Sequence, residues 1–210
     1  MSRLILIGAG GFAREVLEWA SDTNEITANH LITHYLDDKH ADLKSFGYNL
    51  DFLGDITNFK PEKSDRFLLG VGSPEAKRNI LKKFAGYKAQ FQTLIHPTAV
   101  ITRTSNIGVG TIVCPFSVLS ANTRIGNFVT LNCYTSIGHD AVIGDFSTLS
   151  SHVDITGAVQ IGESCFLGSG ARVVPKKKIG NRVNIGAGCT IQSSIKGSGT
   201  YYTAPAKKLF

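Results

Sequence analysis

The hydrophobic period of the chain changes near residue 94. Residues 95, 101, 107 and every sixth residue to 191 are aliphatic, which makes 17 positions in succession. The residue two places before each one is Ala, Ser, Thr, Val or Cys in 16 cases, and Lys177 is the exception. One large and one small inward residue in every six indicate a hexapeptide β-helix, in which three hexapeptides form one triangular coil. Residues 95–196 therefore predict between five and six coils, with a local bulge expected at Lys177.

Before residue 94, short apolar segments alternate with segments of helical period. Strands are predicted at residues 3–7, 32–36 and 66–71, and helices at residues 12–20 and 75–84. Ser73 suits the N-cap of the second helix and Pro74 its first turn. This alternation predicts a parallel sheet. We expect an α/β domain at residues 1–93, a small Rossmann-like βαβ unit, and an all-β parallel β-helix with a short tail at residues 94–210.

Composition narrows the class of protein. No apolar run reaches the roughly 20 residues that a membrane helix needs, and the first apolar run is too short for a signal peptide, so we expect a cytoplasmic protein without a membrane partner. Residues 155–210 hold eight Lys or Arg and one acid, whereas the first 154 residues sum to −1. A basic end on a neutral body favours a local anionic ligand over a nucleic-acid surface. The four cysteines form no CxxC pair, so no zinc site or disulfide framework is indicated.

A glycine loop follows the first strand and matches G-x-G-x-x-G/A at residues 8–13. Its amide groups can hold a phosphate at the helix N-terminus. A dinucleotide site normally uses two βαβ halves, and 93 residues supply little more than one, which favours a nucleotide-sugar over NAD. Asp37 and Asp38 end the second strand, either as hydrogen-bond acceptors for a base or ribose or as solvated turn acids. Gly72 and Ser73 form a possible second phosphate-facing turn.

His139 is the candidate catalytic base. It comes two residues after the inward Ile137, so it lies on a turn outside the core, and Asp140 follows it. In the stacked coils its neighbour is Gly157, whose missing side chain leaves an open slot beside the histidine for an extended chain such as pantetheine. His152 lacks a following acid and is the weaker candidate. With only these two histidines on the coils, a three-histidine zinc site is not expected, and we predict no metal.

Together these segments resemble the family of sialic acid O-acetyltransferases and nucleotide-sugar 4-N-acetyltransferases of bacterial glycan synthesis, which are hexapeptide-repeat acyltransferases. The matching segments are LILIGAGGFAREV, YLDD, LLGVGS, LIHPTAVI, LNCYTSIGHDAVIGD, FLGSGARVVP and the tail APAK. The resemblance implies a left-handed β-helix and a homotrimer with active sites between neighbouring β-helices. Some members carry His in the glycine loop where this chain has Phe12, and the usual G-x-P-A tail reads TAPA here.

The resemblance also implies roles for individual residues. His139 is the general base, Asp140 is the acid beside it, and Asn132 lies near the site. The glycine loop and acidic pair that bind the nucleotide-sugar correspond to Gly10, Gly11, Asp37, Asp38 and Gly72, and main-chain groups at Gly157, Ser169 and Ala187 are expected to contact coenzyme A. Beside the resemblance, we expect Phe12 and Ser73 to adjoin the nucleotide-sugar. The basic coils at Lys176 either meet the phosphates of coenzyme A or form a solvated face.

We therefore expect an acetyl-CoA-dependent N-acetyltransferase acting on the 4-amino group of a nucleotide-linked amino-deoxy sugar. His139 would assist direct transfer, without a metal or covalent intermediate. The alternative is O-acetylation of a sugar of the sialic acid type. An NAD-linked oxidoreductase and a non-catalytic nucleotide-sugar-binding scaffold are more distant alternatives.

Overall fold

The computed structural model describes residues 3–23, 32–204 and 208. Its N-terminal unit is a five-stranded, wholly parallel sheet of order β3-β2-β1-β4-β5. The strands are β1 (Leu4–Ile7), β2 (Ile32–Leu36), β3 (Asp51–Phe52), β4 (Arg66–Leu69) and β5 (Gln90–Phe91). The helices are α1 (Gly11–Ser21), the short 3₁₀ helix η1 (Lys44–Phe46) and α3 (Pro74–Phe84). The expected strands and helices are present within one or two residues, and β3 and β5 were not anticipated.

Two apolar clusters hold this sheet between its helices. The buried face of α1, with Ala13 and Val16, packs with Leu4 and Leu68. Ile80 of α3 packs on the other face of the sheet. Ser73 caps α3 as expected, because its hydroxyl accepts a hydrogen bond from the amide of Ala76 at 3.3 Å.

The second part is a parallel β-helix whose three faces are sheets, and its left-handed winding is the one expected. We name each face by its first strand. The β6 face contains β6 (Leu94–Ile95), β9 (Ile112–Val113), β12 (Thr130–Leu131), β15 (Thr148–Leu149), β18 (Phe166–Leu167), β21 (Val183–Ile185) and β23 (Gly199–Tyr201). The β7 face contains β7 (Val100–Ile101), β10 (Val118–Leu119), β13 (Ser136–Ile137), β16 (Asp154–Ile155), β19 (Arg172–Val173) and β22 (Thr190–Ile191). The β8 face contains β8 (Asn106–Ile107), β11 (Arg124–Ile125), β14 (Val142–Ile143), β17 (Gln160–Ile161) and β20 (Lys178–Ile179).

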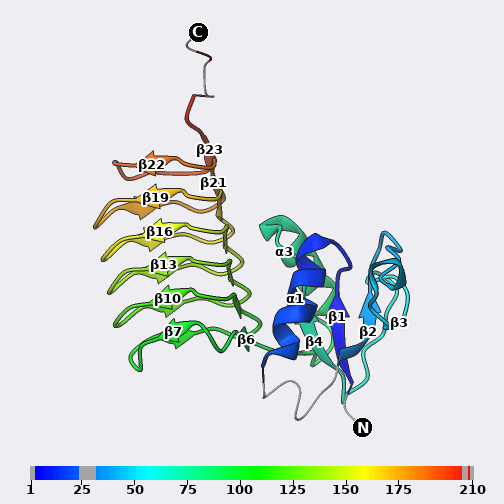
Figure 1. The fold of residues 1–210 in the computed structure, drawn as a ribbon. Coiled ribbons are helices and arrows are strands. Elements are labelled where there is room, and N and C mark those ends of the chain that lie inside the picture. The colour runs from blue at the N-terminus through cyan, green and yellow to red at the C-terminus, as the bar shows by residue number, and fades with distance from the viewer. Residues whose placement is uncertain (1–2, 24–31, 205–207, 209–210) are drawn as a thin grey trace.

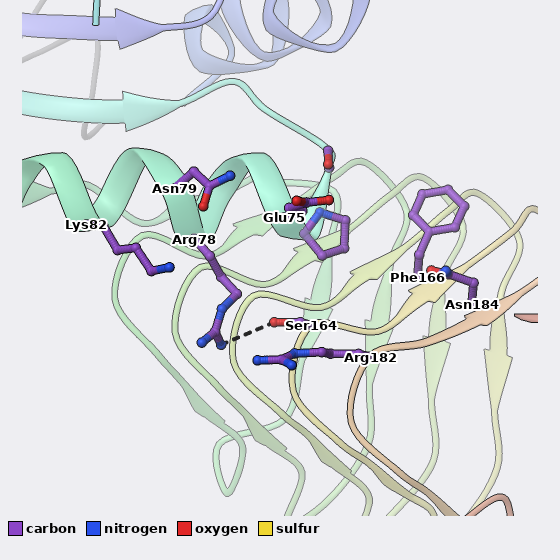
Figure 2. A pocket seen from close by; sticks show the side chains of 10 residues that line it. Glu75, Arg78, Asn79, Lys82, Ser164, Phe166, Arg182 and Asn184 are labelled. Carbon is purple, nitrogen blue, oxygen red and sulfur yellow. Dashed lines mark hydrogen bonds between the residues drawn. The ribbon is translucent and has the colours of Figure 1, made fainter. Parts of the chain in front are cut away.

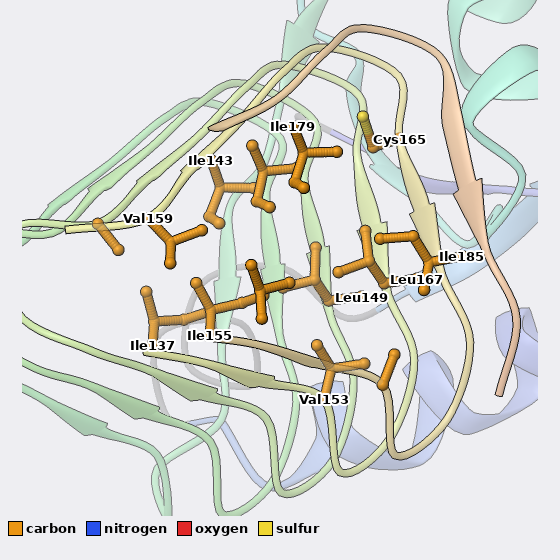
Figure 3. Close-up of a cluster of buried hydrophobic side chains, with 14 of the residues drawn as sticks. Ile137, Ile143, Leu149, Val153, Ile155, Val159, Cys165, Leu167, Ile179 and Ile185 are labelled. Carbon is orange, nitrogen blue, oxygen red and sulfur yellow. The ribbon is translucent and has the colours of Figure 1, made fainter. Parts of the chain in front are cut away.

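The interior follows the sequence period. The large inward residues stack from coil to coil, as Ile137 and Ile155 do in Figure 3, and the small inward residues fill the corners. Buried hydroxyls at the small positions are satisfied, since Thr111 donates to the carbonyl of Gly126 at 2.9 Å and Ser147 to that of Gly162 at 2.9 Å. The coils pass so closely that a Cβ at Gly144 would lie 2.5 Å from the backbone of Gly162, which explains the recurrent glycine after the aliphatic residue. The bulge expected at Lys177 is absent, because β20 pairs with β17 in the same 18-residue register as the strands before it.

The N-terminal unit packs on the outer face of the first coils, along the β6 face (Figure 1). Leu94, Ile112 and Cys114 join the α1 cluster. Farther along the face, Lys77 of α3 is 1% exposed, and its ammonium group has four oxygen acceptors on the β-helix. These are the carbonyls of Phe128 (2.8 Å) and Ser147 (3.2 Å) and the hydroxyls of Thr130 (3.2 Å) and Thr148 (2.8 Å).

Candidate active site

The glycine loop and the loop after β4 follow neighbouring parallel strands of the sheet. The strand order reverses between β1 and β4, and ligands of open α/β sheets bind at such a switch point, outside the carboxyl ends of the strands. The amide of Gly8 donates to the carbonyl of Leu36 (2.8 Å), and that of Gly70 donates to the carbonyl of Ile7 (2.9 Å). These hydrogen bonds fix the start of both loops at the carboxyl edge of the sheet.

Three glycines of these loops face open space. A Cβ added at Gly10 or Gly72 would meet no atom within 4 Å, and one at Gly11 only the guanidinium of Arg14 at 3.8 Å. At Gly70, by contrast, a Cβ would lie 2.9 Å from Ala13, so that glycine is needed for helix packing. Packing therefore does not require glycine at positions 10, 11 and 72. Because glycine has no side chain, the main chain at these positions is accessible to a ligand.

Phe12 is placed differently from these glycines. Its half-buried ring packs edge-on against Trp19, with ring centroids 6.1 Å apart, and joins the α1 cluster. It therefore supplies apolar surface to the packing of α1 and no polar group at the loop.

Asp37 and Asp38 both have partners within the protein. Asp37 is buried and accepts hydrogen bonds from the amides of Lys39 (3.2 Å) and Ala41 (3.1 Å). Asp38 accepts from the amide of Thr57 at 3.2 Å and pairs with Lys83 at 3.4 Å. Asp37 thus shapes the turn after β2, and Asp38 links that turn to α3.

His139 and Asp140 form an exposed pair at the turn after β13. The His139 Nδ1 lies 2.8 Å from the Asp140 carboxylate, and the two side chains are 69% and 54% exposed. With Nδ1–H donating to the carboxylate, Nε2 is the ring nitrogen left to accept a proton. Hydrogen bonds from His139, and then from Asn122, lower the pKa of Asp140 below its ordinary value, so the carboxylate stays ionised beside the imidazole.

The imidazole itself occupies the space over Gly157. A Cβ at that position would lie 2.5 Å from His139 Nε2, so the slot expected beside the histidine is filled by its own ring. The expectation of an open channel there is wrong. Gly157 instead lets the ring lean over the next coil, with Nε2 as the ring atom nearest to that glycine.

Asn122 is a site residue that the sequence analysis missed. Its side-chain amide donates to Asp140 Oδ1 at 3.2 Å, and its backbone amide donates to the hydroxyl of Thr104 at 2.9 Å. Asn122 lies one coil below Asp140, and the 18-residue spacing between them is the signal that would have identified it.

The remaining expected residues divide between two corners of the β-helix. Gly157 and Lys176 lie at the corner between the β7 and β8 faces, with His139. Asn132, Ser169 and Ala187 lie at the corner between the β6 and β7 faces. The side-chain oxygen of Asn132 accepts a hydrogen bond from the backbone amide of Cys133 at 2.7 Å. Within one chain, therefore, the structure does not bring Asn132 to His139.

The corner of His139 is also the one opposite the N-terminal unit. That unit covers the β6 face, whereas His139 stands where the other two faces meet. Because a triangular coil places each corner across from one face, the glycine loop and His139 of one chain lie on opposite sides of the β-helix.

Two further features bear on the predicted chemistry. His152 stacks flat on Tyr134, with ring centroids 4.9 Å apart, and is part of an exposed ladder of aromatic rings that begins at Phe116.

In the described part of the chain, no group of three or more His, Cys, Asp or Glu side chains is arranged to hold a metal ion. No helix within those residues is long and apolar enough to cross a membrane.

Comparisons with known proteins agree with this architecture. The model of the PglD N-terminal domain matches residues 3–84, and that of the six bacterial transferase hexapeptide repeats matches residues 158–193. UDP-N-acetylbacillosamine N-acetyltransferase of Bacillus subtilis (strain 168) is 31% identical over 121 residues, or 54% of this chain and 51% of that protein. The match thus spans about half the length of this curated relative.

Solved structures match over nearly the whole chain. The acetyltransferase domain of PglB from Neisseria gonorrhoeae FA1090 has a TM-score of 0.86 and 26% identity, with 100% of both chains covered. PerB from Caulobacter crescentus, solved with CoA and GDP-perosamine, has a TM-score of 0.85 and 25% identity, with 99% of this chain and 97% of PerB covered. The chain is thus similar to a PglD N-terminal domain over residues 3–84 and to bacterial transferase hexapeptide repeats over residues 158–193, in agreement with the family resemblance found in the sequence.

Proposed function

We propose that the protein transfers the acetyl group of acetyl-CoA to the amino group of a nucleotide-linked amino-deoxy sugar. The observation that carries this proposal is the exposed His139–Asp140 pair on a hexapeptide β-helix joined to a PglD-type domain. The names of the relatives support the same class, since the Bacillus subtilis protein is a UDP-N-acetylbacillosamine N-acetyltransferase and PerB was solved with CoA and GDP-perosamine.

The pair is suited to general base catalysis. As the amine attacks the thioester carbon, Nε2 of His139 takes a proton from the nitrogen, the C–S bond breaks, and coenzyme A leaves as a thiol after protonation. Asp140 holds the Nδ1 proton and stabilises the imidazolium that forms. Base assistance of this kind typically contributes about 10²–10⁴-fold to the rate. Main-chain groups at Gly157, Ser169 and Ala187, with Lys176, are proposed to hold coenzyme A.

We further propose that the active site is completed by a second chain in a homotrimer. The glycine loop proposed to hold the nucleotide lies across the β-helix from His139 of its own chain, so a neighbour must supply the sugar. Exposed apolar side chains offer a contact surface beside the β6–β7 corner. Val100 is 59% exposed and Tyr134 is 52% exposed, with Phe116 and Val118 adjoining them.

Mass spectrometry of reactions containing acetyl-CoA and a panel of UDP-, dTDP- and GDP-linked 4-amino sugars tests the function. One sugar should gain a single acetyl group, and fragmentation should place it on nitrogen. Acetylation on a hydroxyl would select the O-acetyltransferase alternative. If the protein binds a nucleotide-sugar but acetylates none of the panel, it would be a non-catalytic binding scaffold.

A further inference from the structure

A cleft opens where the N-terminal unit ends but the β6 face continues. The outward residue of β15, Thr148, is 4% exposed beneath α3, whereas the outward residue of β18, Phe166, is 37% exposed. The coils that contain β18 and β21 therefore extend past α3 and form a concave junction with it. This junction forms an open cleft of about 680 Å³, which we call the α3 cleft.

Cations from both parts of the molecule line the α3 cleft. Its walls include Arg78, Asn79 and Lys82 from α3, and Phe166, Arg182 and Asn184 from the β-helix (Figure 2). Arg78 is held in place by Ser164 (3.3 Å) and by Glu163 at the rim (3.5 Å), and its guanidinium lies 5.3 Å from the ring centre of Phe146.

Arg182 and Lys82 have no such partner. Within the described residues, no carboxylate lies within 4 Å of either cation, and Glu75 is the one acid among the lining residues. Two unneutralised cations thus line the cleft together with the anchored Arg78. Like charges gathered in a concave site favour an anionic ligand, because the field is focused there.

The lining defines the class of ligand. Guanidinium groups bind phosphate oxygens with a planar pair of donors, and an ammonium group adds a mobile third contact. The exposed ring of Phe166 offers a flat apolar surface, and the amides of Asn79 and Asn184 offer donors and acceptors. The volume lies within the range typical of small-molecule sites. These features fit a phosphate ester that carries a planar ring, such as a nucleoside diphosphate.

We propose that the α3 cleft is a second ligand site, for a nucleoside phosphate, that bridges the two parts of the chain. It shares Ser73 with the loop after β4, but Gly10, Gly11 and Asp37 are not among its lining residues. In Figure 2, α3 separates the cleft from β4. The proposal does not depend on the acetyl-transfer reaction, and it adds a site to those proposed for the nucleotide-sugar and coenzyme A.

A fluorescence reporter placed in the cleft tests the proposal without interference from the other sites. Phe166→Trp puts an indole in the wall, and Trp19→Phe removes the one natural tryptophan. Titration of this otherwise full-length protein with ADP should give a saturable change in emission. Adding Arg182→Gln or Lys82→Gln should weaken binding at least about tenfold, because each removes a charged hydrogen-bond donor.

Three controls decide the outcome. Lys63→Gln removes an exposed lysine that does not line the cleft, and it should leave the ADP curve unchanged. Adenosine, which has the ring but no phosphate, should bind at least about tenfold more weakly than ADP. No saturable change up to about 10 mM ADP, equal binding of adenosine, or an unchanged curve in the Arg182→Gln variant would each overturn the proposal.

Discussion

At the scale of single residues, the proposed catalytic group is a chain of three side chains on two adjacent coils. Asn122 donates to Asp140, and Asp140 accepts from His139 Nδ1, which leaves Nε2 as the ring nitrogen without a partner in this group. Asn122 and Asp140 both adopt left-handed backbone angles, with φ near +60°. The turn repeated in every coil therefore places the three groups in line, and each can be tested separately.

Replacing His139 with alanine should lower kcat at least about 10²-fold while the oligomer stays intact, because the side chain lies outside the core and supplies the base. Steady-state kinetics and light scattering measure both effects. His152→Ala is the matched control, since it removes another exposed histidine at the corner between the β6 and β7 faces, and it should keep near-normal turnover. Near-normal turnover of His139→Ala would remove that residue from the mechanism.

Asn122→Gly should act through Asp140. Glycine keeps the left-handed backbone without strain but removes the donor to the carboxylate, so the pKa of Asp140 should rise toward its ordinary value. We expect a loss in kcat of about tenfold or less, because the group is exposed, and a rise in the pKa of Asp140, measured by NMR titration of its carboxyl carbon. A loss in kcat with an unchanged pKa of Asp140 would contradict the positioning role.

At the scale of elements, α3 connects the two parts of the molecule through Lys77. Burial lowers the pKa of this lysine to about 7, from 10.5 in the unfolded chain. The unfolded state therefore binds more protons between these values, and the contribution of Lys77 to stability should rise as pH increases from about 7 to about 10.5.

Lys77→Met isolates this effect. The difference in unfolding free energy between wild type and Lys77→Met should increase across that pH window by an amount on the order of a few kcal/mol at most. Urea unfolding at several pH values measures it, and Lys83→Met, on the exposed side of α3, is the control. Parallel pH curves for wild type and Lys77→Met would show that Lys77 does not titrate in this range.

The basic coils above His139 form the second element to test. Lys176 lies two coils beyond Asp140 at the same corner, which is about 10 Å at one strand spacing per coil. Replacing Lys176, Lys177 and Lys178 with glutamine should raise the KM for acetyl-CoA and leave the sugar KM nearly unchanged. In this variant the KM for acetyl-CoA should also increase less steeply with ionic strength than it does in wild type. Replacing Lys39, Lys60 and Lys63 with glutamine is the control. An unchanged acetyl-CoA KM in the variant of Lys176, Lys177 and Lys178 would show that these three lysines are a solvated face.

At the scale of the whole molecule, the β-helix separates the glycine loop from His139 of the same chain. Two inactive variants should therefore complement each other if the site lies between chains. One carries His139→Ala, and the other carries Gly10→Trp, which fills the open space at the loop. If the proposed trimer assembles at random from equal amounts of the two variants, roughly a quarter of the sites would pair an intact histidine with an intact loop.

Activity near that level after co-refolding or co-expression is the expected result, measured against each variant alone. Each variant alone should stay inactive, and their mixture before subunit exchange serves as the control. If full exchange of subunits restores no activity, each chain must complete its own site.

The sequence by itself determined the β-helix, because its period is local: one aliphatic residue in six, with glycine where the coils approach, specifies the coil without reference to the rest of the chain. It also placed His139 and Asp140, which are adjacent in sequence. It did not reveal β3 and β5, which are two residues long and have no period to detect. Nor did it reveal Asn122, which reaches Asp140 only when the coils stack.

Only the tertiary structure decided how the two parts are joined. The packing of α1 and α3 on the β6 face rests on contacts more than 50 residues apart, such as Lys77 with Thr130, and no local pattern encodes them. The stacking of the coils placed the His139 ring over Gly157. The packing of the two parts placed the glycine loop on the far side of the β-helix and left the α3 cleft open. Periodicity fixes what repeats along a chain, whereas the docking of unlike surfaces depends on shape and charge that appear only after both have folded.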